Sequence, residues 1–110
     1  MKTFEFSELI KQREKSGKLY LEFLNLPSLS MGLYELKAGA KDPQKPHSED
    51  EVYYVVSGRG KIFVENEDRD VMPGSIIYVA ANTEHRFHSI TEDLSLLVFF
   101  APAEYSNQTS

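Results

Sequence analysis

The 110-residue sequence contains no cysteine and no long apolar run. Without cysteine there are no disulfide bonds, thiolate metal sites or cysteine nucleophiles, so any bound metal must be held by histidine, aspartate or glutamate. The longest largely apolar stretch, residues 94–102, is far shorter than the roughly 20 residues of a membrane-spanning helix. The N-terminus does not have the layout of a secretory signal, because Glu5 and Glu8 stand where an apolar core should follow. A cytoplasmic protein that does not contact membranes is therefore expected.

Basic residues are also in the minority. The 12 lysines and arginines are outnumbered by 17 acidic residues, which gives a net charge of −5. Nucleic-acid binding rests on a basic surface that neutralises phosphates, so this balance disfavours a nucleic-acid partner. Basic side chains do cluster between Lys11 and Lys18, but Glu14 interrupts them. This mixture is typical of a solvated helix face.

The length favours one domain, residues 1–110, because a chain of this size holds one hydrophobic core and is too short for two. An N-terminal helical segment is expected over 1–17. The helix itself is predicted at 6–16, and Gly17 is placed to end it. A polar tail, residues 103–110, is predicted to be frayed.

Between residues 18 and 102, strand-like runs alternate with turn residues. About seven or eight short strands are expected, at intervals of roughly ten residues. Two of them, 51–57 and 61–65, are predicted to be joined by a hairpin turn at 58–60, which reads Gly-Arg-Gly. Together with the short helix, this pattern indicates an all-β sandwich or barrel.

Three residues in this region suggest metal chemistry. His47 and Glu51 stand four residues apart at the start of one predicted strand, and His85 lies close to another. Imidazole and carboxylate groups are ligands for divalent first-row metals. Inside a small barrel a buried histidine and glutamate need a partner, and a metal ion suits both. From these residues alone, the alternative is an exposed acidic turn over 47–51.

The spacing resembles the two signature motifs of the cupin superfamily, small jelly-roll barrels (double-stranded β-helices) that often hold a metal. His47, Glu51 and Gly58 match the last three fixed positions of the first motif, and Gly74 and His85 match two positions of the second. The spacer of 15 residues between the two glycines is similar to that of compact cupins. The resemblance implies an all-β, cupin-type jelly-roll barrel.

Within residues 39–89, which the motifs span, the chain departs from the cupin pattern. Lys45 stands where the first histidine of the first motif would be, and an ammonium group has no lone pair to donate. Glu49 or Gln44 is the alternative occupant of that ligand position, but Glu49 falls in a turn where acidic side chains are commonly solvated. Asn82 replaces a glycine of the second motif, and asparagine can still adopt a positive φ.

The ligand set that the resemblance implies is His47, Glu51 and His85. Two histidines and one carboxylate are the ligands of non-haem Fe(II) oxygenases, so iron or manganese is favoured, with zinc, nickel or cobalt as alternatives. The implied function is a metal-dependent enzyme, dioxygenase- or isomerase-like, that acts on a small organic molecule. The alternative is a non-catalytic metal- or small-molecule-binding sensor with a degenerate site, which Lys45 supports. Many cupins pair, so a homodimer is expected.

Strand alternation predicts which side chains surround this site. Tyr53 shares a face with Glu51, and Phe87 shares one with His85, so both aromatic rings are expected inside the barrel. Such a lining forms a pocket for a small molecule. His88 has the opposite parity and is expected to face outward. A metal-free epimerase of the cupin type would need a His–Asp pair in the pocket, and the sequence offers no evident one.

Overall fold

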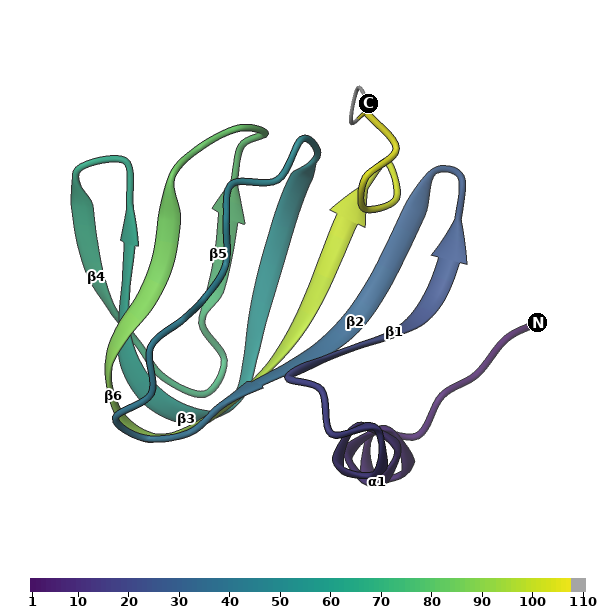
Figure 1. The fold of residues 1–110 in the computed structure, drawn as a ribbon, viewed down its shortest axis with the longest axis horizontal. Coiled ribbons are helices and arrows are strands. Elements are labelled where there is room, and N and C mark those ends of the chain that lie inside the picture. Colours follow the sequence, from purple (N-terminus) through teal and green to yellow (C-terminus); the bar gives the residue numbers. More distant parts are fainter. Residues whose placement is uncertain (108–110) are drawn as a thin grey trace.

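The computed structural model of the chain describes residues 1–107. In that part of the chain one helix precedes six strands, and all strand pairings are antiparallel. The elements, which Figure 1 colours from purple to yellow, are α1 (Phe6–Ser16), β1 (Tyr20–Leu26), β2 (Leu29–Leu36), β3 (Asp50–Val64), β4 (Glu67–Val71), β5 (Ile76–Val79) and β6 (His85–Ala101). Among these residues no helix has the length and apolarity needed to cross a membrane.

The strands form one sheet that curls into a barrel. Its order is β1-β2-β6-β3-β4, and β5 pairs with the first part of β3 while β4 pairs with the last part. Strands β3 and β6, of 15 and 17 residues, run down one wall, across the base and up the other wall (Figure 1). The predicted all-β jelly roll with one short helix is confirmed.

Gly58 lies where β3 bends. The register of β3 against β6 shifts three times between Val55 and Lys61, and such bulges bend a strand. Gly58 has a φ of 97°, and a side-chain carbon there would lie 2.2 Å from the carbonyl oxygen of Asp93, so only glycine fits. The predicted hairpin turn at 58–60 is therefore wrong, because these glycines form a bulge within one continuous strand.

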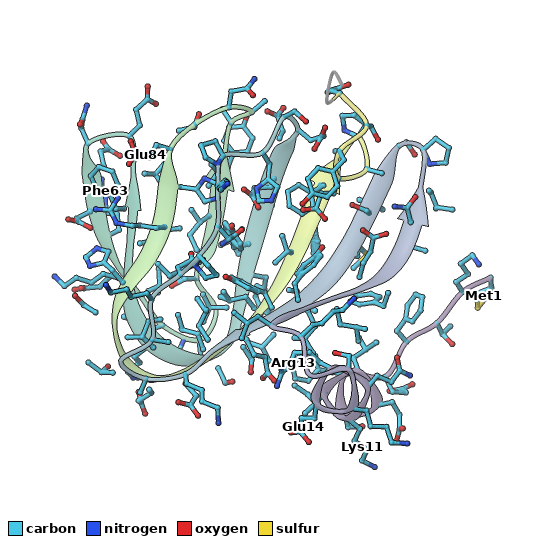
Figure 2. All side chains as sticks on the ribbon, in the orientation of Figure 1. Met1, Lys11, Arg13, Glu14, Phe63 and Glu84 are labelled. Carbon is cyan, nitrogen blue, oxygen red and sulfur yellow. The ribbon has the colours of Figure 1, made fainter. Side chains whose placement is uncertain are left out.

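Helix α1 lies against β1 and β2 on the outside of the sheet (Figure 1). Its Leu9 is buried, and Arg13 Nε lies 2.6 Å from a carboxylate oxygen of Glu35 in β2. Figure 2 shows Arg13 on the side of the helix that faces the sheet and Lys11 on the opposite side. Gly17 ends the helix with a φ of 70°, as predicted.

The barrel interior changes character along β3. Val55 pairs with Leu96 of β6 shortly before the bend at Gly58, and both belong with Leu94 to the hydrophobic core, where all three are fully buried. Toward the start of β3 the inward-facing residues are Tyr53 and then Glu51, which are equally buried. The interior is thus apolar at the base and polar at the end where β3 begins.

Residues 103–107 fold back onto this polar end. Ala103 is buried, and the main-chain N–H of Glu104 donates to Ser30 Oγ of β2 at 2.9 Å. The prediction of a frayed tail is therefore wrong for 103–107, because long-range hydrogen bonds hold these residues. The remainder of the predicted tail, 108–110, lies outside the described residues.

Candidate metal centre

The polar end of the barrel brings His47, Glu51 and His85 together. His47 lies in the loop before β3, Glu51 is the second residue of β3, and His85 is the first residue of β6. The loop before β6 is tied to the loop before β3, because the N–H of Asn82 donates to the carbonyl oxygen of His47 at 2.6 Å. Asn82 has a φ of 61°, so the expectation of a positive φ at this position is met.

One potential ligand atom of each residue lies within 4.8 Å of the other two. Glu51 Oε1 is 2.8 Å from His85 Nε2 and 3.3 Å from His47 Nδ1. The side chains of Glu51 and His85 are each 1% exposed, and that of His47 is 11% exposed. The cluster is therefore shielded from bulk water.

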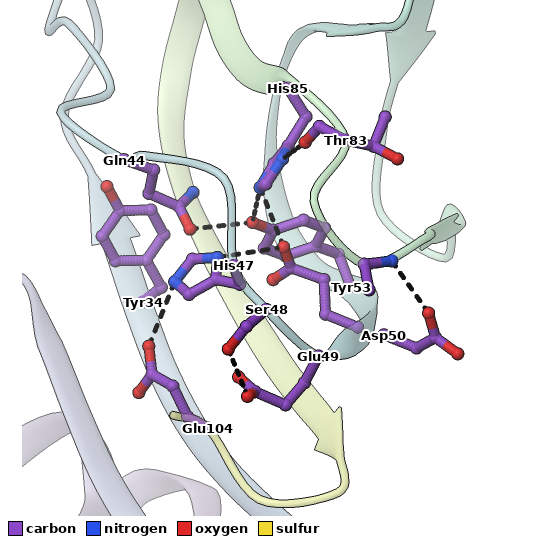
Figure 3. A network of polar contacts seen from close by, with 12 residues as sticks. Tyr34, Gln44, His47, Ser48, Glu49, Asp50, Tyr53, Thr83, His85 and Glu104 are labelled. Carbon is purple, nitrogen blue, oxygen red and sulfur yellow. Dashed lines mark hydrogen bonds and ion pairs between the residues drawn. The ribbon is translucent and has the colours of Figure 1, made fainter. Parts of the chain in front are cut away.

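The outer nitrogen of each imidazole already has an acceptor (Figure 3). His85 Nδ1 lies 2.8 Å from the carbonyl oxygen of Thr83, and His47 Nε2 lies 3.1 Å from a carboxylate oxygen of Glu104. An ionised carboxylate or a carbonyl can only accept, so each outer nitrogen carries a proton. In a neutral ring the other nitrogen, which faces the cluster, then carries an unshared lone pair. These inner nitrogens, His47 Nδ1 and His85 Nε2, both face Glu51.

Electron-rich atoms that face one another in a buried site need a positive charge between them. Glu51 Oε2 and His47 Nδ1 are buried and have no hydrogen-bond partner among the described residues. Either protons on the histidines or a cation can supply the charge. Two imidazole nitrogens and one carboxylate are a common donor set for divalent transition metals, so the residues present fit such an ion.

The pKa values follow from the same contacts. Burial alone would lower the pKa of His47, but the hydrogen bond to Glu104 and the interaction with Glu51 outweigh it and raise the pKa from 6.5 to about 9. Burial also opposes the charged form of His85, yet Glu51 raises the pKa of this histidine. Burial disfavours ionised Glu51, but the two histidines lower its pKa. Without a metal, the cluster therefore retains protons that a metal ion would displace.

The three residues considered for the missing ligand position lie in different environments. Lys45 is exposed. Gln44 Oε1 accepts a hydrogen bond from Tyr53 Oη at 2.9 Å, and the same hydroxyl lies 3.1 Å from His85 Nε2. Gln44 is thus linked to the cluster through Tyr53, while Glu49 lies outside the cluster.

Glu49 differs most from its prediction. It is 1% exposed, and its carboxylate accepts hydrogen bonds from the main-chain N–H groups of Tyr105 and Asn107 at 2.7 and 2.8 Å. Ser48 Oγ donates to the same carboxylate. The prediction of a solvated turn is wrong, because partners more than fifty residues away in the chain cover this side chain.

A cavity of about 890 Å³ adjoins the cluster. Its walls include Tyr20, Tyr34, Gln44, His47, Phe100 and Glu104. Of the three candidate ligands only His47 lines the cavity, and the other two lie deeper in the barrel. A small molecule in the cavity would therefore approach the cluster from the His47 side.

Tyr20 gives the cavity wall an unusual feature. Its hydroxyl is buried and has no hydrogen-bond partner among the described residues. The ring lies directly over Gly32, where a side-chain carbon would stand 2.1 Å from a ring atom. Burial and the nearby Glu104 raise the pKa of Tyr20, so the hydroxyl keeps its proton as a hydrogen-bond donor.

The remaining sequence predictions divide as follows. Tyr53 and Phe87 are buried in the barrel, as predicted. His88 points outward, as predicted, and contacts Asp68 with side chains that are 31% and 54% exposed, so this His–Asp pair lies outside the cavity. Sequence reasoning missed Glu104, because it belongs to a polar tail that carries no motif.

Comparison with known proteins places this chain in a family. The model of the cupin domain family matches residues 32–100, and the chain belongs to that family. An uncharacterised protein of Streptomyces coelicolor is 50% identical over 104 residues, which cover 94% of this chain and 99% of the relative. Acireductone dioxygenase 4 of Arabidopsis thaliana is 31% identical over 86 residues, which cover 74% of this chain and 46% of the relative.

Solved structures support the same fold. An RmlC-like cupin family protein of Methanocaldococcus jannaschii, with a double-stranded β-helix fold, aligns with a TM-score of 0.74 at 20% identity, over 94% of this chain and 92% of that one. KdgF from a Halomonas species aligns with a TM-score of 0.68 at 24% identity, over 76% and 78% of the two chains. The structural likeness confirms the double-stranded β-helix.

Proposed function

We propose that this cupin binds a divalent transition metal through His47, Glu51 and His85 and acts on a small organic molecule in the adjoining cavity. The observation that carries the proposal is the convergence of two inner imidazole nitrogens on one buried carboxylate. Iron or manganese is favoured, because two histidines and one carboxylate are typical of non-haem iron oxygenases, and zinc, nickel and cobalt are the alternatives. The likeness to a relative named as a dioxygenase supports a dioxygenase-like over an isomerase-like reaction.

The side chains around the cluster have separate tasks in this proposal. When bound, the metal would supply open coordination positions where a substrate and dioxygen can meet. Tyr53 keeps its proton, because burial and the charge of Glu51 raise its pKa, so its hydroxyl donates to Gln44 Oε1 while its oxygen lies 3.1 Å from His85 Nε2. Lys45 lines the cavity with an exposed positive charge, which favours an anionic organic substrate.

A second candidate function is a non-catalytic cupin that senses or stores a metal or a small molecule. Lys45 favours this alternative, because it replaces a histidine of the family motif and leaves a cluster of three ligands. Both functions require metal binding or small-molecule binding at the same place, so turnover is what separates them.

Metal analysis of protein purified without chelator tests the metal site. We expect about one equivalent of a transition metal after reconstitution with Fe(II) or Mn(II), and much less in a Glu51→Gln variant treated identically. Less than about a tenth of an equivalent in the wild type, with no gain on reconstitution, would rule out the metal-dependent enzyme.

Turnover is tested with the metal-loaded protein. Small organic acids that raise its melting temperature are incubated with it in air, and the mixtures are analysed by mass spectrometry. A ligand that is converted supports the enzyme, and a ligand that binds and is recovered unchanged supports the sensor. The Glu51→Gln variant serves as the control for conversion by free metal.

We also propose that the protein forms a homodimer. Ile76 and Tyr78 of the short edge strand β5 are 71% and 61% exposed, and Met72 and Tyr54 nearby are 47% and 38% exposed. A second copy would cover these apolar side chains. Light scattering tests this, since a solution mass near the 12.6 kDa of one chain would contradict it.

A further inference from the structure

The two histidines of the cluster are oriented by different parts of the chain. His85, the first residue of β6, is held through Nδ1 by the carbonyl oxygen of Thr83, which is two residues earlier in the loop before this strand. His47 is held through Nε2 by the carboxylate of Glu104, which comes from the folded C-terminal turn, residues 103–107 (Figure 3). One ring is therefore oriented locally, and the other depends on a segment 57 residues further along the chain.

Glu104 is placed firmly enough to orient a ring. Its side chain is 9% exposed, and its main-chain N–H donates to Ser30 Oγ. Further along the turn, the main-chain N–H groups of Tyr105 and Asn107 donate to the buried carboxylate of Glu49. The turn is thus fastened at Glu104 itself and at two residues that follow it, by side chains from two separate parts of the chain.

The contact with Glu104 decides which nitrogen of His47 faces the cluster. The carboxylate lies 3.1 Å from Nε2, and this leaves Nδ1 directed at Glu51, 3.3 Å away. The ring of Phe100 packs against the imidazole with centroids 4.7 Å apart, which limits tilting of the ring but does not select a nitrogen. Among the described residues, Glu104 is the acceptor that makes this selection.

We infer that Glu104 is a positioning residue, which fixes the ring of His47 for metal binding, and that Glu49 holds Glu104 in place through the main chain of the C-terminal turn. The inference rests on the proposed metal site for its functional consequence, since the affinity of the cluster for metal would then depend on this turn. An acceptor hydrogen-bonded to a ligating histidine typically contributes about 10–100-fold to metal affinity.

The first test reads the orientation of His47 without metal. In nitrogen-15 NMR of the metal-free protein, a ring N–H that is hydrogen-bonded and shielded from water exchanges slowly enough to be observed. We expect such resonances from His47 Nε2 and His85 Nδ1 in the wild type. Glu104→Ala should remove the His47 resonance and leave that of His85, whose acceptor is a main-chain carbonyl.

The second test is calorimetric titration with Co(II). Glu104→Ala should weaken binding by about 10–100-fold. Glu104→Gln, whose amide oxygen still accepts from Nε2, should recover most of the affinity. Glu84→Gln removes a charge next to His85 in the chain, but its side chain is 74% exposed, so this control should bind as the wild type does.

Substitution of Glu49 tests whether this residue holds Glu104 in place through the C-terminal turn. Glu49→Gln keeps one acceptor oxygen for the two main-chain N–H groups, so it should weaken Co(II) binding less than Glu104→Ala does, whereas Glu49→Ala should approach the effect of Glu104→Ala. Equal affinity of Glu49→Ala and the wild type would remove Glu49 from the inference.

Two results would overturn the role of Glu104: an unchanged His47 ring resonance in Glu104→Ala, or Co(II) affinity within about threefold of the wild type. If Glu104→Ala does not fold, Glu104→Asp and Glu104→Gln are compared in the same way. If the wild type binds no metal, the proposed metal site fails, and the ring resonance alone then decides whether Glu104 orients His47.

Discussion

The two ends of the barrel interior are built on the same strands but differ in the interactions of their buried side chains. At the base, Val55, Leu94 and Leu96 are buried and apolar, and their packing needs no further partner. At the other end, Glu51 and His85 are equally buried, yet the cluster that they form with His47 leaves buried polar atoms without hydrogen bonds. The base thus stabilises the fold, whereas the polar end presents a carboxylate and two imidazoles that fit either shared protons or the proposed metal ion.

The comparison shows how one strand serves both purposes. Strand β3 directs Glu51, Tyr53 and Val55 to the same side, so the interior passes from a carboxylate to a phenol to an aliphatic group within five residues. The carboxylate of Glu51 is buried at the polar end, where burial opposes its charged form but the two histidines lower its pKa. Changes at the two ends should therefore differ in what they affect.

The largest effect is expected at the base. Leu96→Ala leaves a cavity in a fully buried site and should lower the free energy of unfolding by about 2–5 kcal/mol. Urea denaturation measures this loss. If the variant remains folded, its affinity for metal should be close to that of the wild type, and a loss of affinity as large as that of Glu51→Gln would contradict the separation of the two ends.

Substitution of Glu51, the central carboxylate, should reduce metal binding rather than the stability of the metal-free fold. Metal at about 100 times its dissociation constant should stabilise the wild type by about 2.7 kcal/mol, because it binds only the folded state. Glu51→Gln removes the negative charge that both inner nitrogens face and should abolish this stabilisation at the same metal concentration. Thermal denaturation with and without Mn(II) makes the comparison, and an equal rise in both proteins would exclude Glu51 as a ligand.

The effect of pH on stability and metal affinity, which acts through His47 at the polar end, should be intermediate in size. The pKa of His47 is 6.5 in its ordinary state and about 9 in the folded protein, so the stability that protonated His47 contributes is complete below pH 6.5 and is lost as the pH rises through 9. Metal must displace this proton, so metal affinity should rise over the same interval. Calorimetry at pH 7 in buffers of different ionisation enthalpy should detect proton release, and none in the wild type would contradict this account.

The smallest effect is expected at Lys45. Its side chain is exposed, and an exposed side chain away from buried contacts usually changes stability by less than about 0.5 kcal/mol. Lys45→Ala should therefore leave both the free energy of unfolding and the metal affinity nearly unchanged. A large loss of metal affinity would mean that the lysine takes part in the cluster after all.

The sequence was informative where the spacing of residues matches a regular element or a known motif. Alternation along a strand correctly placed Tyr53 and Phe87 in the interior, and Gly17 correctly ended the helix. The motif spacing of His47, Glu51 and His85 predicted a cluster that the barrel brings within ligand distance. Whether the cluster binds a metal stays a prediction.

Sequence reasoning failed where distant segments meet. Gly58 and Gly60 suggest a hairpin turn, but the close approach of Asp93 from β6 turns them into a bulge. Glu49 looked solvated because its partners, the N–H groups of Tyr105 and Asn107, lie at the other end of the chain. No local pattern predicts that a polar C-terminal segment covers a carboxylate, since main-chain donors are present in nearly every residue.

The most direct test of the metal site is a crystal of the wild-type protein soaked in Mn(II), with diffraction data collected for anomalous scattering. The account predicts a strong anomalous peak within coordination distance of His47 Nδ1, a carboxylate oxygen of Glu51 and His85 Nε2. A peak held by other residues, or none between these three side chains at a saturating Mn(II) concentration, would contradict it.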